Sequence, residues 1–321
     1  MIKIATLLGL AFLVNSPIYA ADVLDEPIRP ITIPDITDPQ MVDLGHKLFH
    51  EMRLSLNGTI SCASCHSLST AGMDGLVESI GVNGQLGGIN TPTVFNSRLN
   101  FRQMWDGRAF NLMEQVEKPI LNPKEMGSNW AHILNFLQND PPYLKLFSRT
   151  FSDGLTQNNV KKALVAFEET LLTPNSRFDR YLMGEADAIT VDELMGYSLF
   201  KEYGCISCHQ GMAVGGNLFQ KLGLMKDYFS DRGNITTADL GRFNVTQKEK
   251  DRHVFKVPSL RNIELTAPYF HDGSINTLDS AVRVMMVYQL GIKPIETDIQ
   301  LIVKFLRTLT GEYQGVPLNN E

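Results

Sequence analysis

Two pentapeptides contain all four cysteines of the chain, Cys62-Ala-Ser-Cys65-His66 and Cys205-Ile-Ser-Cys208-His209. In the pattern C-x-x-C-H, both thiols form thioether bonds to the vinyl groups of a c-type haem, and the adjacent histidine becomes the proximal iron ligand. A zinc site made from two C-x-x-C pairs would place them about 15–20 residues apart, and a redox dithiol needs no histidine. The two motifs therefore predict two covalently bound haem c groups.

The first twenty residues have the composition of a secretory signal peptide. A basic residue, Lys3, precedes an apolar run from Ile4 to Val14, and small residues follow at Ala20 and Ala21. The run is too short to span a bilayer, although a buried N-terminal helix is the alternative. Because bacteria attach haem to C-x-x-C-H outside the cytoplasm, export and haem attachment agree. We expect a periplasmic protein whose mature part has no membrane span.

Length and charge limit the classes of function. The chain has 321 residues, of which 43% are hydrophobic, and its formal net charge is −6. At about 100–200 residues per domain, this length predicts two domains with separate cores. The acidic balance argues against nucleic acid as a partner, because that partner requires a basic face. It is compatible with a basic redox partner.

A short internal repeat precedes the two haem motifs. Gly45 and Gly196 each begin the pattern Gly-x-x-Leu-Phe, which places its apolar residues on one helical face. The patterns end at Phe49 and Phe200, and the first is separated from its cysteines by a longer stretch, which predicts an insertion at about Met52–Thr59. We infer two copies of one haem-binding unit.

Apolar residues recur at helical spacing in four further segments, 130–138, 160–172, 278–289 and 297–309. Pro174 ends the second of them. The glycine-rich stretch Gly81–Gly88 predicts a loop, because no nucleotide-binding context surrounds it. Few stretches alternate as strands do. We therefore predict a mainly α protein with an extended lead-in over residues 21–40, one domain over 41–180 and a second over 181–321, with the boundary within 175–190.

Four segments resemble a known family. They are Thr91-Pro-Thr-Val-Phe-Asn96, Met104-Trp105-Asp-Gly-Arg-Ala109, Phe167-Glu-Glu-Thr-Leu-Leu-Thr-Pro174 and Leu265-Thr-Ala-Pro-Tyr-Phe-His271-Asp-Gly273. Together with the two haem motifs, they look like the bacterial dihaem cytochrome c peroxidases, whose superfamily includes the MauG-type enzymes. The resemblance runs from about Leu44 to Gly311. It implies two cytochrome-c-like domains, each with one covalent haem, whose haem sites face the domain interface.

The resemblance assigns electron entry to the second haem, at Cys205, Cys208 and His209. It places the axial methionine of this haem at Met285. A thioether ligand favours ferrous iron and raises its reduction potential, which suits a haem that collects electrons. Without the family motif, Met285 and Met286 would be interpreted as core residues of an amphipathic helix.

The first haem, at Cys62, Cys65 and His66, is implied to be the site where peroxide reacts, and here the sequence departs from the family. In the peroxidases, a later histidine caps the oxidised haem and must leave before peroxide binds. The corresponding residue here is Val82, and no histidine lies within 67–100. Valine has no lone pair for iron. We therefore expect an open site that reacts with peroxide without reductive activation.

The alternative is that a different side chain caps the first haem. The candidates are Met73, Met104, His46, His50 and His132.

Three more residues match the catalytic apparatus of the family. Glu125 matches the glutamate that moves a proton between the two peroxide oxygens, a task for which a carboxylate must lie within reach of them. Gln115 matches an amide that donates or accepts hydrogen bonds in the same pocket. Trp105 matches the tryptophan between the haems. The alternatives are solvated surface positions for Glu125 and Gln115 and a core position for Trp105.

Asn90, with the backbone carbonyls of Thr266 and Pro268, matches the interdomain calcium site of the family. Oxygen ligands of this kind suit calcium, and an asparagine in an ordinary turn is the alternative. His271 is implied to lie near the haem edges, in a structural or a redox role.

The resulting expectation is a periplasmic peroxidase that reduces hydrogen peroxide with electrons from a small cytochrome c or cupredoxin. A second hypothesis is a MauG-like enzyme that oxidises residues of a partner protein, although such enzymes carry a tyrosine in place of Met285. A third is an electron carrier or peroxide sensor, which would need both irons six-coordinate. By analogy with the family alone, the protein forms a homodimer.

Overall fold

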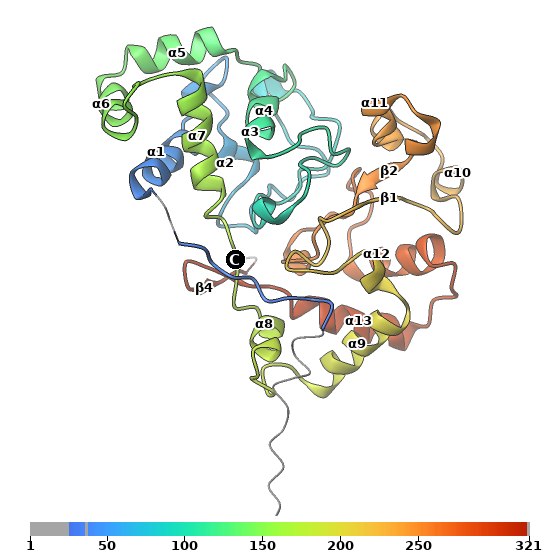
Figure 1. Cartoon of the computed structure of the whole chain (residues 1–321). Coiled ribbons are helices and arrows are strands. Elements are labelled where there is room, and N and C mark those ends of the chain that lie inside the picture. Colours follow the sequence, from blue (N-terminus) through green and yellow to red (C-terminus); the bar gives the residue numbers. More distant parts are fainter. Residues whose placement is uncertain (1–25, 36–37, 320–321) are drawn as a thin grey trace, which may run out of the picture.

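The computed structural model describes residues 26–35 and 38–319, and the predicted signal peptide lies outside them (Figure 1). This part of the protein is mostly helical, as predicted, and none of its helices is long and apolar enough to cross a bilayer. The α-helices are α1 (Pro39–Phe49), α2 (Cys62–Cys65), α3 (Leu112–Gln115), α4 (Glu117–Leu121), α5 (Trp130–Gln138), α6 (Pro141–Thr150), α7 (Gln157–Glu168), α8 (Arg177–Leu182), α9 (Val191–Glu202), α10 (Tyr228–Arg232), α11 (Phe243–Thr246), α12 (Leu278–Val284) and α13 (Glu296–Arg307).

The strands in this part of the chain are short. β1 (Phe219–Lys221) pairs antiparallel with β2 (Val254–Lys256), and β3 (Glu312–Tyr313) pairs antiparallel with β4 (Val316–Pro317). Neither pair forms a core of its own, so the helices carry the architecture.

The helices expected from periodicity are present, and α5 has the expected bounds. α7 ends at Glu168, four residues before the expected end. The chain turns away there because the Thr170 hydroxyl donates to the carbonyl of Phe167 at 2.7 Å, and the Leu171 carbonyl accepts from the backbone N–H of Asn96 at 2.7 Å. Contacts with the preceding part of the chain therefore replace the last helical turn.

Periodicity predicts one continuous α-helix over the segment 278–289, but the structure differs. α12 ends at Val284, and Met285–Gln289 form a π-helical turn, η9, in which the N–H of Leu290 donates to the carbonyl of Met285 at 3.1 Å. Such wider turns occur often at functional sites, because they change the direction of the side chains that follow. The Gly81–Gly88 stretch is a loop, as predicted, with a single short 3₁₀ turn at Val82–Gly84.

Buried apolar side chains form two large clusters. The first extends along the chain from Leu44 to Leu171, and the second from Phe178 to Leu309. Figure 1 shows α1–α7 together in one half of the molecule and α8–α13 in the other. Cys62 packs against the first cluster and Cys205 against the second, so each haem motif lies beside its own core.

The same helix crossing occurs once in each half. In the first, α1 crosses α7 so closely that a Cβ on Gly45 would lie 1.9 Å from the carbonyl oxygen of Ala163. In the second, α9 crosses α13, and a Cβ on Gly196 would lie 1.9 Å from the carbonyl oxygen of Leu301. Both glycines come from the repeated Gly-x-x-Leu-Phe pattern, so the structure explains the repeat as a close approach of two helix backbones.

The lead-in packs against the half that is distant in sequence. Ile28 is fully buried in the second cluster and forms a parallel bridge with Gly211. Arg261, only 1% exposed, donates to the carbonyl of Arg29 at 2.8 Å and pairs with the buried Asp179 at 2.8 Å. One buried guanidinium therefore links the lead-in, α8 and the loop that contains Arg261.

We expect Gly45→Ala to destabilise the protein by about 1–3 kcal/mol or more, because a methyl group would force α1 and α7 apart. Gly196→Ala should have a similar cost at the other crossing. Urea unfolding measures both. Gly87→Ala is the control, since its Cβ would lie 3.6 Å from its nearest neighbour, the carbonyl oxygen of Ser79, which is an ordinary contact. An unchanged unfolding midpoint for Gly45→Ala would show that the two helices can separate without cost.

Arg261→Met should lower the free energy of unfolding by about 3–5 kcal/mol, because it leaves the Asp179 carboxylate buried without its cation. The double variant Arg261→Met/Asp179→Asn removes both charges and keeps the cap of α8. The double variant should regain a large part of the lost free energy of unfolding, as the same measurement would show. Equal stability of the single and double variants would show that the ion pair does not couple the two residues.

Candidate functional site

The first haem motif forms one helical turn, α2. Ser61 caps its start by donating its backbone N–H to the Ser64 hydroxyl at 2.9 Å, and His66 follows its end with its N–H donating to the Cys62 carbonyl at 2.9 Å. The Nδ1 atom of His66 lies 3.1 Å from the carbonyl oxygen of Gly72. A carbonyl only accepts, so Nδ1 carries the proton, and the lone pair on Nε2 is free for a metal.

The second motif has the same arrangement. The N–H of His209 donates to the Cys205 carbonyl at 3.0 Å, and Nδ1 of His209 lies 3.3 Å from the carbonyl oxygen of Val214. Burial lowers the pKa of His66, and burial lowers the pKa of His209 to about 4. Both imidazoles are therefore neutral at pH 7, which is the form that binds metal.

The cysteines do not have the properties of a redox dithiol. All four are free thiols. Burial raises the pKa of Cys62 to about 12 and those of Cys65 and Cys205 to about 11. Redox-active thiols have a lowered pKa that makes the thiolate available. The site chemistry therefore favours haem attachment over thiol exchange.

A cavity with mostly apolar walls surrounds the second motif. Cys205, Cys208 and His209 line it, together with Met285 from the π-helical turn. Leu278, Phe200 and Leu306 contribute to its apolar surface. These residues fit a haem group: two thiols for attachment, a histidine with a free Nε2 and a thioether in the same cavity. The structure thus brings together the residues that the sequence assigned to the second haem.

Glu125 lies beside the first motif, in the turn after α4. Its charge raises the pKa of Cys65, so the carboxyl and this thiol are close enough to interact. Burial raises the pKa of Glu125. The hydrogen bond that its Oε1 accepts from Asn122 at 2.6 Å and the charge of Arg108 lower this pKa, but burial outweighs them. The Oε1 atom of Gln115, at the end of α3, is buried without a hydrogen-bond partner. Neither residue has the solvated position of an ordinary surface side chain.

Val82 is a core residue rather than a ligand. It is 1% exposed, and its backbone N–H donates to the carbonyl of Glu125 at 2.7 Å. Its side chain packs closely against Gly127: a Cβ on Gly127 would lie 2.8 Å from Val82 Cγ2. The position of the family's capping histidine is therefore tied to the segment that holds Glu125.

The alternative capping residues have other surroundings. His46 and His50 lie on α1 with their ring centroids 4.6 Å apart, and both contact Phe167. Met73 is 2% exposed, and its sulfur accepts from the N–H of Gly75 at 3.0 Å. Met104 lies in a turn with a positive φ, and His132 lies on α5.

Trp105 lies where the two halves meet. Its Nε1 donates to the carbonyl of Asn90 at 2.9 Å, its carbonyl accepts from the N–H of Lys256 at 2.8 Å, and its ring is 6.4 Å from that of His271. It also lines the cavity of the second motif. A residue from the first half thus forms part of the wall of the second site.

Asn90, Thr266 and Pro268 line this same cavity. Asn90 is 4% exposed, and its side-chain amide donates to the carbonyl of Leu76 at 2.9 Å. The three residues are therefore near the meeting of the two halves, and a calcium ion there stays a prediction.

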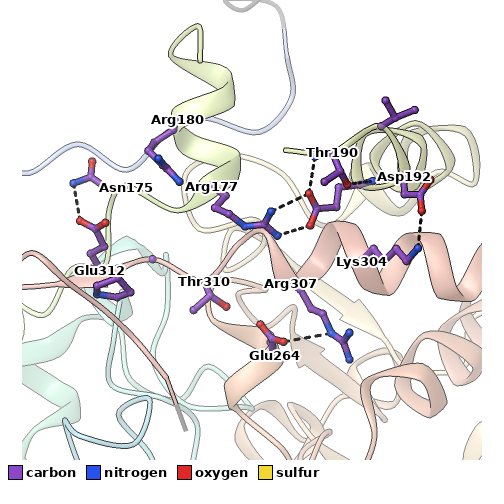
Figure 2. Close-up of a pocket in the computed structure, with 14 residues that line it drawn as sticks. Asn175, Arg177, Arg180, Thr190, Asp192, Glu264, Lys304, Arg307, Thr310 and Glu312 are labelled. Carbon is purple, nitrogen blue, oxygen red and sulfur yellow. Dashed lines mark hydrogen bonds and ion pairs between the residues drawn. The ribbon is translucent and has the colours of Figure 1, made fainter. Parts of the chain in front are cut away.

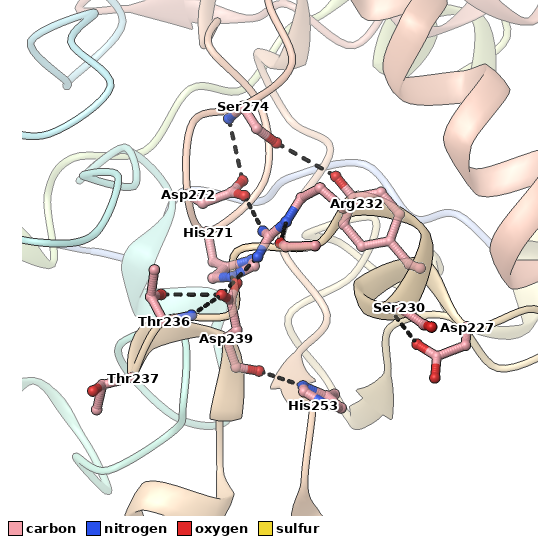
Figure 3. Close-up of polar contacts among 12 residues, drawn as sticks. Asp227, Ser230, Arg232, Thr236, Thr237, Asp239, His253, His271, Asp272 and Ser274 are labelled. Atoms are coloured by element: carbon pink, nitrogen blue, oxygen red, sulfur yellow. Dashed lines mark hydrogen bonds and ion pairs between the residues drawn. The ribbon is translucent and has the colours of Figure 1, made fainter.

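An ionic network holds His271 in place (Figure 3). Its Nε2 lies 2.7 Å from Asp239 Oδ1, and Arg232 binds both Asp239 and Asp272. Burial alone would raise the pKa of Asp239, but the hydrogen bonds from Arg232, Thr236 and His271 outweigh it and hold this pKa far below its usual range. Two carboxylates and an imidazole are close enough here to hold a metal ion. Because Arg232 already pairs with both carboxylates, we interpret the cluster as structural.

The sequence analysis missed this network and also Lys256. Lys256 is 7% exposed and lines the second cavity, and burial lowers its pKa to about 8. The available signal was a single lysine inside the apolar run 254–258. Arg232 and Asp239 are only seven residues apart, but their other partners, Asp272 and His271, are distant in sequence.

A polar groove of about 840 Å³ lies away from both motifs, between α8, α9 and α13 (Figure 2). Its charges neutralise one another in pairs: Arg177 with Glu193, Lys304 with Asp192, and Arg307 with Glu264. It is lined by no cysteine, histidine or methionine. The groove therefore offers no redox chemistry.

Comparisons with known proteins agree with this site. Residues 39–187 match the family described as di-haem cytochrome c peroxidase. The chain is 48% identical over 290 residues to cytochrome c peroxidase Ccp of Escherichia coli (strain K12), with 90% of this chain and 62% of that protein covered. It thus spans about three fifths of the length of that relative.

The chain is also 47% identical over 289 residues to cytochrome c551 peroxidase of Nitrosomonas europaea, with 90% of this chain and 85% of that protein covered. Its fold is similar to the crystal structure of a MauG-like protein associated with microbial copper homeostasis, with a TM-score of 0.75 and 28% identity over 94% of this chain and 96% of the other. The chain belongs to the di-haem cytochrome c peroxidase family.

Proposed function

We propose that the protein is a dihaem c-type peroxidase that reduces hydrogen peroxide to water, H₂O₂ + 2 H⁺ + 2 e⁻ → 2 H₂O. The observation that carries the proposal is the shared geometry of His66 and His209, each with Nδ1 at a backbone carbonyl and Nε2 free for iron. Bound haem would supply the iron that accepts electrons and breaks the O–O bond. The names of two relatives, a cytochrome c peroxidase and a cytochrome c551 peroxidase, support the same reaction.

Electrons would enter at the second site, from a small cytochrome c or cupredoxin. His209 and Met285 would be the two axial ligands there, and the soft thioether of Met285 would keep the potential high. Trp105 lies between the halves with both its Nε1 and its carbonyl hydrogen-bonded. An indole held in this position would suit electron transfer from the second site to the His66 site.

Peroxide would react at the first site, where His66 is the proximal ligand. Glu125 would take a proton from one peroxide oxygen and return it to the other, since its buried carboxyl has a raised pKa and keeps a proton more readily than an exposed one. Gln115 would hydrogen-bond the substrate through its Oε1 atom, which has no partner within the described part of the chain. Because Val82 cannot bind iron, the site would be open in the oxidised enzyme.

The remaining parts of the proposal concern location and calcium. We place the enzyme in the periplasm, because the N-terminal pattern and the haem motifs both require export. A calcium ion at Asn90, Thr266 and Pro268 would stabilise the contact between the halves near Trp105.

A second candidate function is MauG-like oxidation of residues in a partner protein. It is favoured by Val82, which leaves the first haem uncapped, and by the fold similarity to a MauG-like protein. Met285 argues against it, because the MauG-type enzymes carry a tyrosine there. Steady-state turnover of peroxide with reduced cytochrome c separates the two: rapid turnover supports the peroxidase, and negligible turnover the protein oxidase.

Glu125→Gln should lower peroxide turnover by about 10²–10⁴, the usual contribution of an acid–base group, because the amide cannot carry the proton between the oxygens. Steady-state kinetics with a reduced cytochrome c measures the change. Glu114→Gln is the matched control, since Glu114 is an exposed carboxyl of α3 and should leave the rate unchanged. A Glu125→Gln enzyme with the wild-type rate would remove Glu125 from the mechanism.

The fully ferric protein should react with hydrogen peroxide before any reduction, because no side chain has to leave the first iron. Electron paramagnetic resonance of the resting protein should show a high-spin signal, and its absorption spectrum should change on addition of peroxide. Val82→His restores the family's cap and should make the first haem low-spin and unreactive until reduced. Two low-spin haems and no response to peroxide in the wild type would contradict the open site.

A further inference from the structure

Glu168, the last residue of α7, is a buried acid with no role in the chemistry described so far. The residue is 6% exposed, and its Oε2 atom has no hydrogen-bond partner among the described residues. A buried carboxyl without a partner is uncommon, because removing it from water without compensation is costly. Burial, with a smaller contribution from Glu169, raises its pKa to about 8, so this carboxyl binds a proton much more readily than an exposed one.

The internal repeat indicates which part of the first haem unit Glu168 faces. At the two helix crossings, a Cβ on Gly45 would lie 2.8 Å from Phe167 Cβ, and a Cβ on Gly196 would lie 3.1 Å from Phe305 Cβ. Phe167 and Phe305 are therefore equivalent positions on α7 and α13. The residue after Phe167 is Glu168, and the residue after Phe305 is Leu306.

Leu306 lines the cavity of the second haem motif, beside Cys205 and His209. Its equivalent, Glu168, should therefore face the corresponding space at the first motif. A separate observation agrees: the charge of Glu168 raises the pKa of the Cys62 thiol, so the two groups are close enough to interact. The two haem units thus differ at one equivalent position, with an acid at the first and leucine at the second.

We propose that Glu168 takes up the proton that accompanies one-electron reduction of the first haem. The inference rests on the proposed function, since it requires a haem at Cys62, Cys65 and His66. In this step, the electron comes from the donor protein and the proton from solvent. The positive charge of the oxidised iron would lower the pKa of Glu168 and hold it as the carboxylate. Glu168–COO⁻ would become Glu168–COOH as the haem gains one electron, so the net charge of the pocket would not change. Charge balance of this kind matters in an apolar pocket, where an uncompensated charge is costly.

Most titratable groups around Glu168 are exposed. Those on its own helix and on the elements packed against it are Glu169, Cys62, Lys161, Lys162, Asp43, His46, Lys47, His50, Glu114 and Glu117. Asp43, His46, Lys47, His50, Glu114 and Lys162 are exposed. Glu169 is exposed, and Glu117 is already neutralised by Lys161 at 3.1 Å. The thiol of Cys62 would be consumed by haem attachment. The two histidines lie on α1 on the Phe167 side, so Glu168 is the acid left to respond.

The test uses the holoenzyme and measures the reduction potential of each haem against pH by spectroelectrochemistry. In the wild type, the potential of the first haem should fall as pH rises, by up to about 59 mV per pH unit, the value for a tenfold change with one electron. In Glu168→Gln this dependence should disappear. The potential of the second haem, where Leu306 carries no proton, should not respond to the substitution.

Glu169→Gln is the matched control, because it removes a neighbouring exposed carboxyl from the same helix end. It should keep the pH dependence of the wild type. Glu168→Leu, which copies Leu306, gives a second variant if the glutamine variant folds poorly. Infrared difference spectra provide an independent readout: reduction should produce the C=O band of a protonated carboxylic acid, and this band should be absent in Glu168→Gln.

The haem content of each variant separates failure of this inference from failure of the proposed function. Fewer than two haems per chain in the wild type would overturn the proposed function itself. Two haems with an unchanged pH dependence in Glu168→Gln, or no carboxylic acid band on reduction, would overturn the role of Glu168 alone.

Discussion

A helix crossing with no side chain between the two backbones determines where each haem-binding turn lies. Gly45 lets α1 approach α7, and Gly196 lets α9 approach α13, to distances at which a methyl group would overlap a carbonyl. In the second half, Gly204 in the left-handed conformation connects α9 directly to Cys205. The motif is therefore held by a pair of closely packed helices, and its histidine is oriented through Nδ1, which lies at the carbonyl of Val214.

A shared scaffold with different side chains explains how one chain can place two irons in different environments. The second cavity has apolar walls and a thioether at Met285, and its position equivalent to Glu168 is Leu306. Such surroundings stabilise the reduced iron and exclude protons. The first site has the buried carboxyls Glu125 and Glu168. In the proposed function, electron storage and proton chemistry would thus be separated between the two halves of the molecule, although the helices that support them match.

Features that depend on residue types and their spacing could be predicted from the sequence. Features that depend on which side chains the fold buries could not. The C-x-x-C-H motifs, the helix of α5 and the repeated glycine depend on local patterns. The π-helical turn at Met285 was missed, because periodicity over 278–289 does not distinguish a turn of this kind from a regular helix. Glu168 did leave a signal, since a charged residue interrupts the apolar face of the segment 160–172.

Other features depend on contacts between residues far apart in the chain. The ion pair of Arg261 with Asp179 exists only after folding brings the partners together. The same holds for the contacts of Arg232 with Asp272 and of Asp239 with His271. An isolated arginine in a sequence is interpreted as a surface residue by default, because most arginines are exposed. The prediction of a mainly helical protein is therefore confirmed, whereas charges that tertiary structure buries were not predicted.

The contact between the halves is built from polar groups that are buried and bonded on both sides. Thr173, in the segment that joins them, accepts from the side-chain amide of Asn96 at 2.7 Å and from that of Asn262 at 3.0 Å. Breaking such a contact would leave several buried donors and acceptors unpaired, which costs more than the loss of an equal apolar area. The halves are thus held at a fixed separation, with Trp105 bonded between Asn90 and Lys256. Because electron transfer between two centres depends steeply on their distance, a polar contact that permits few alternative arrangements is the physical basis for using both sites in one reaction.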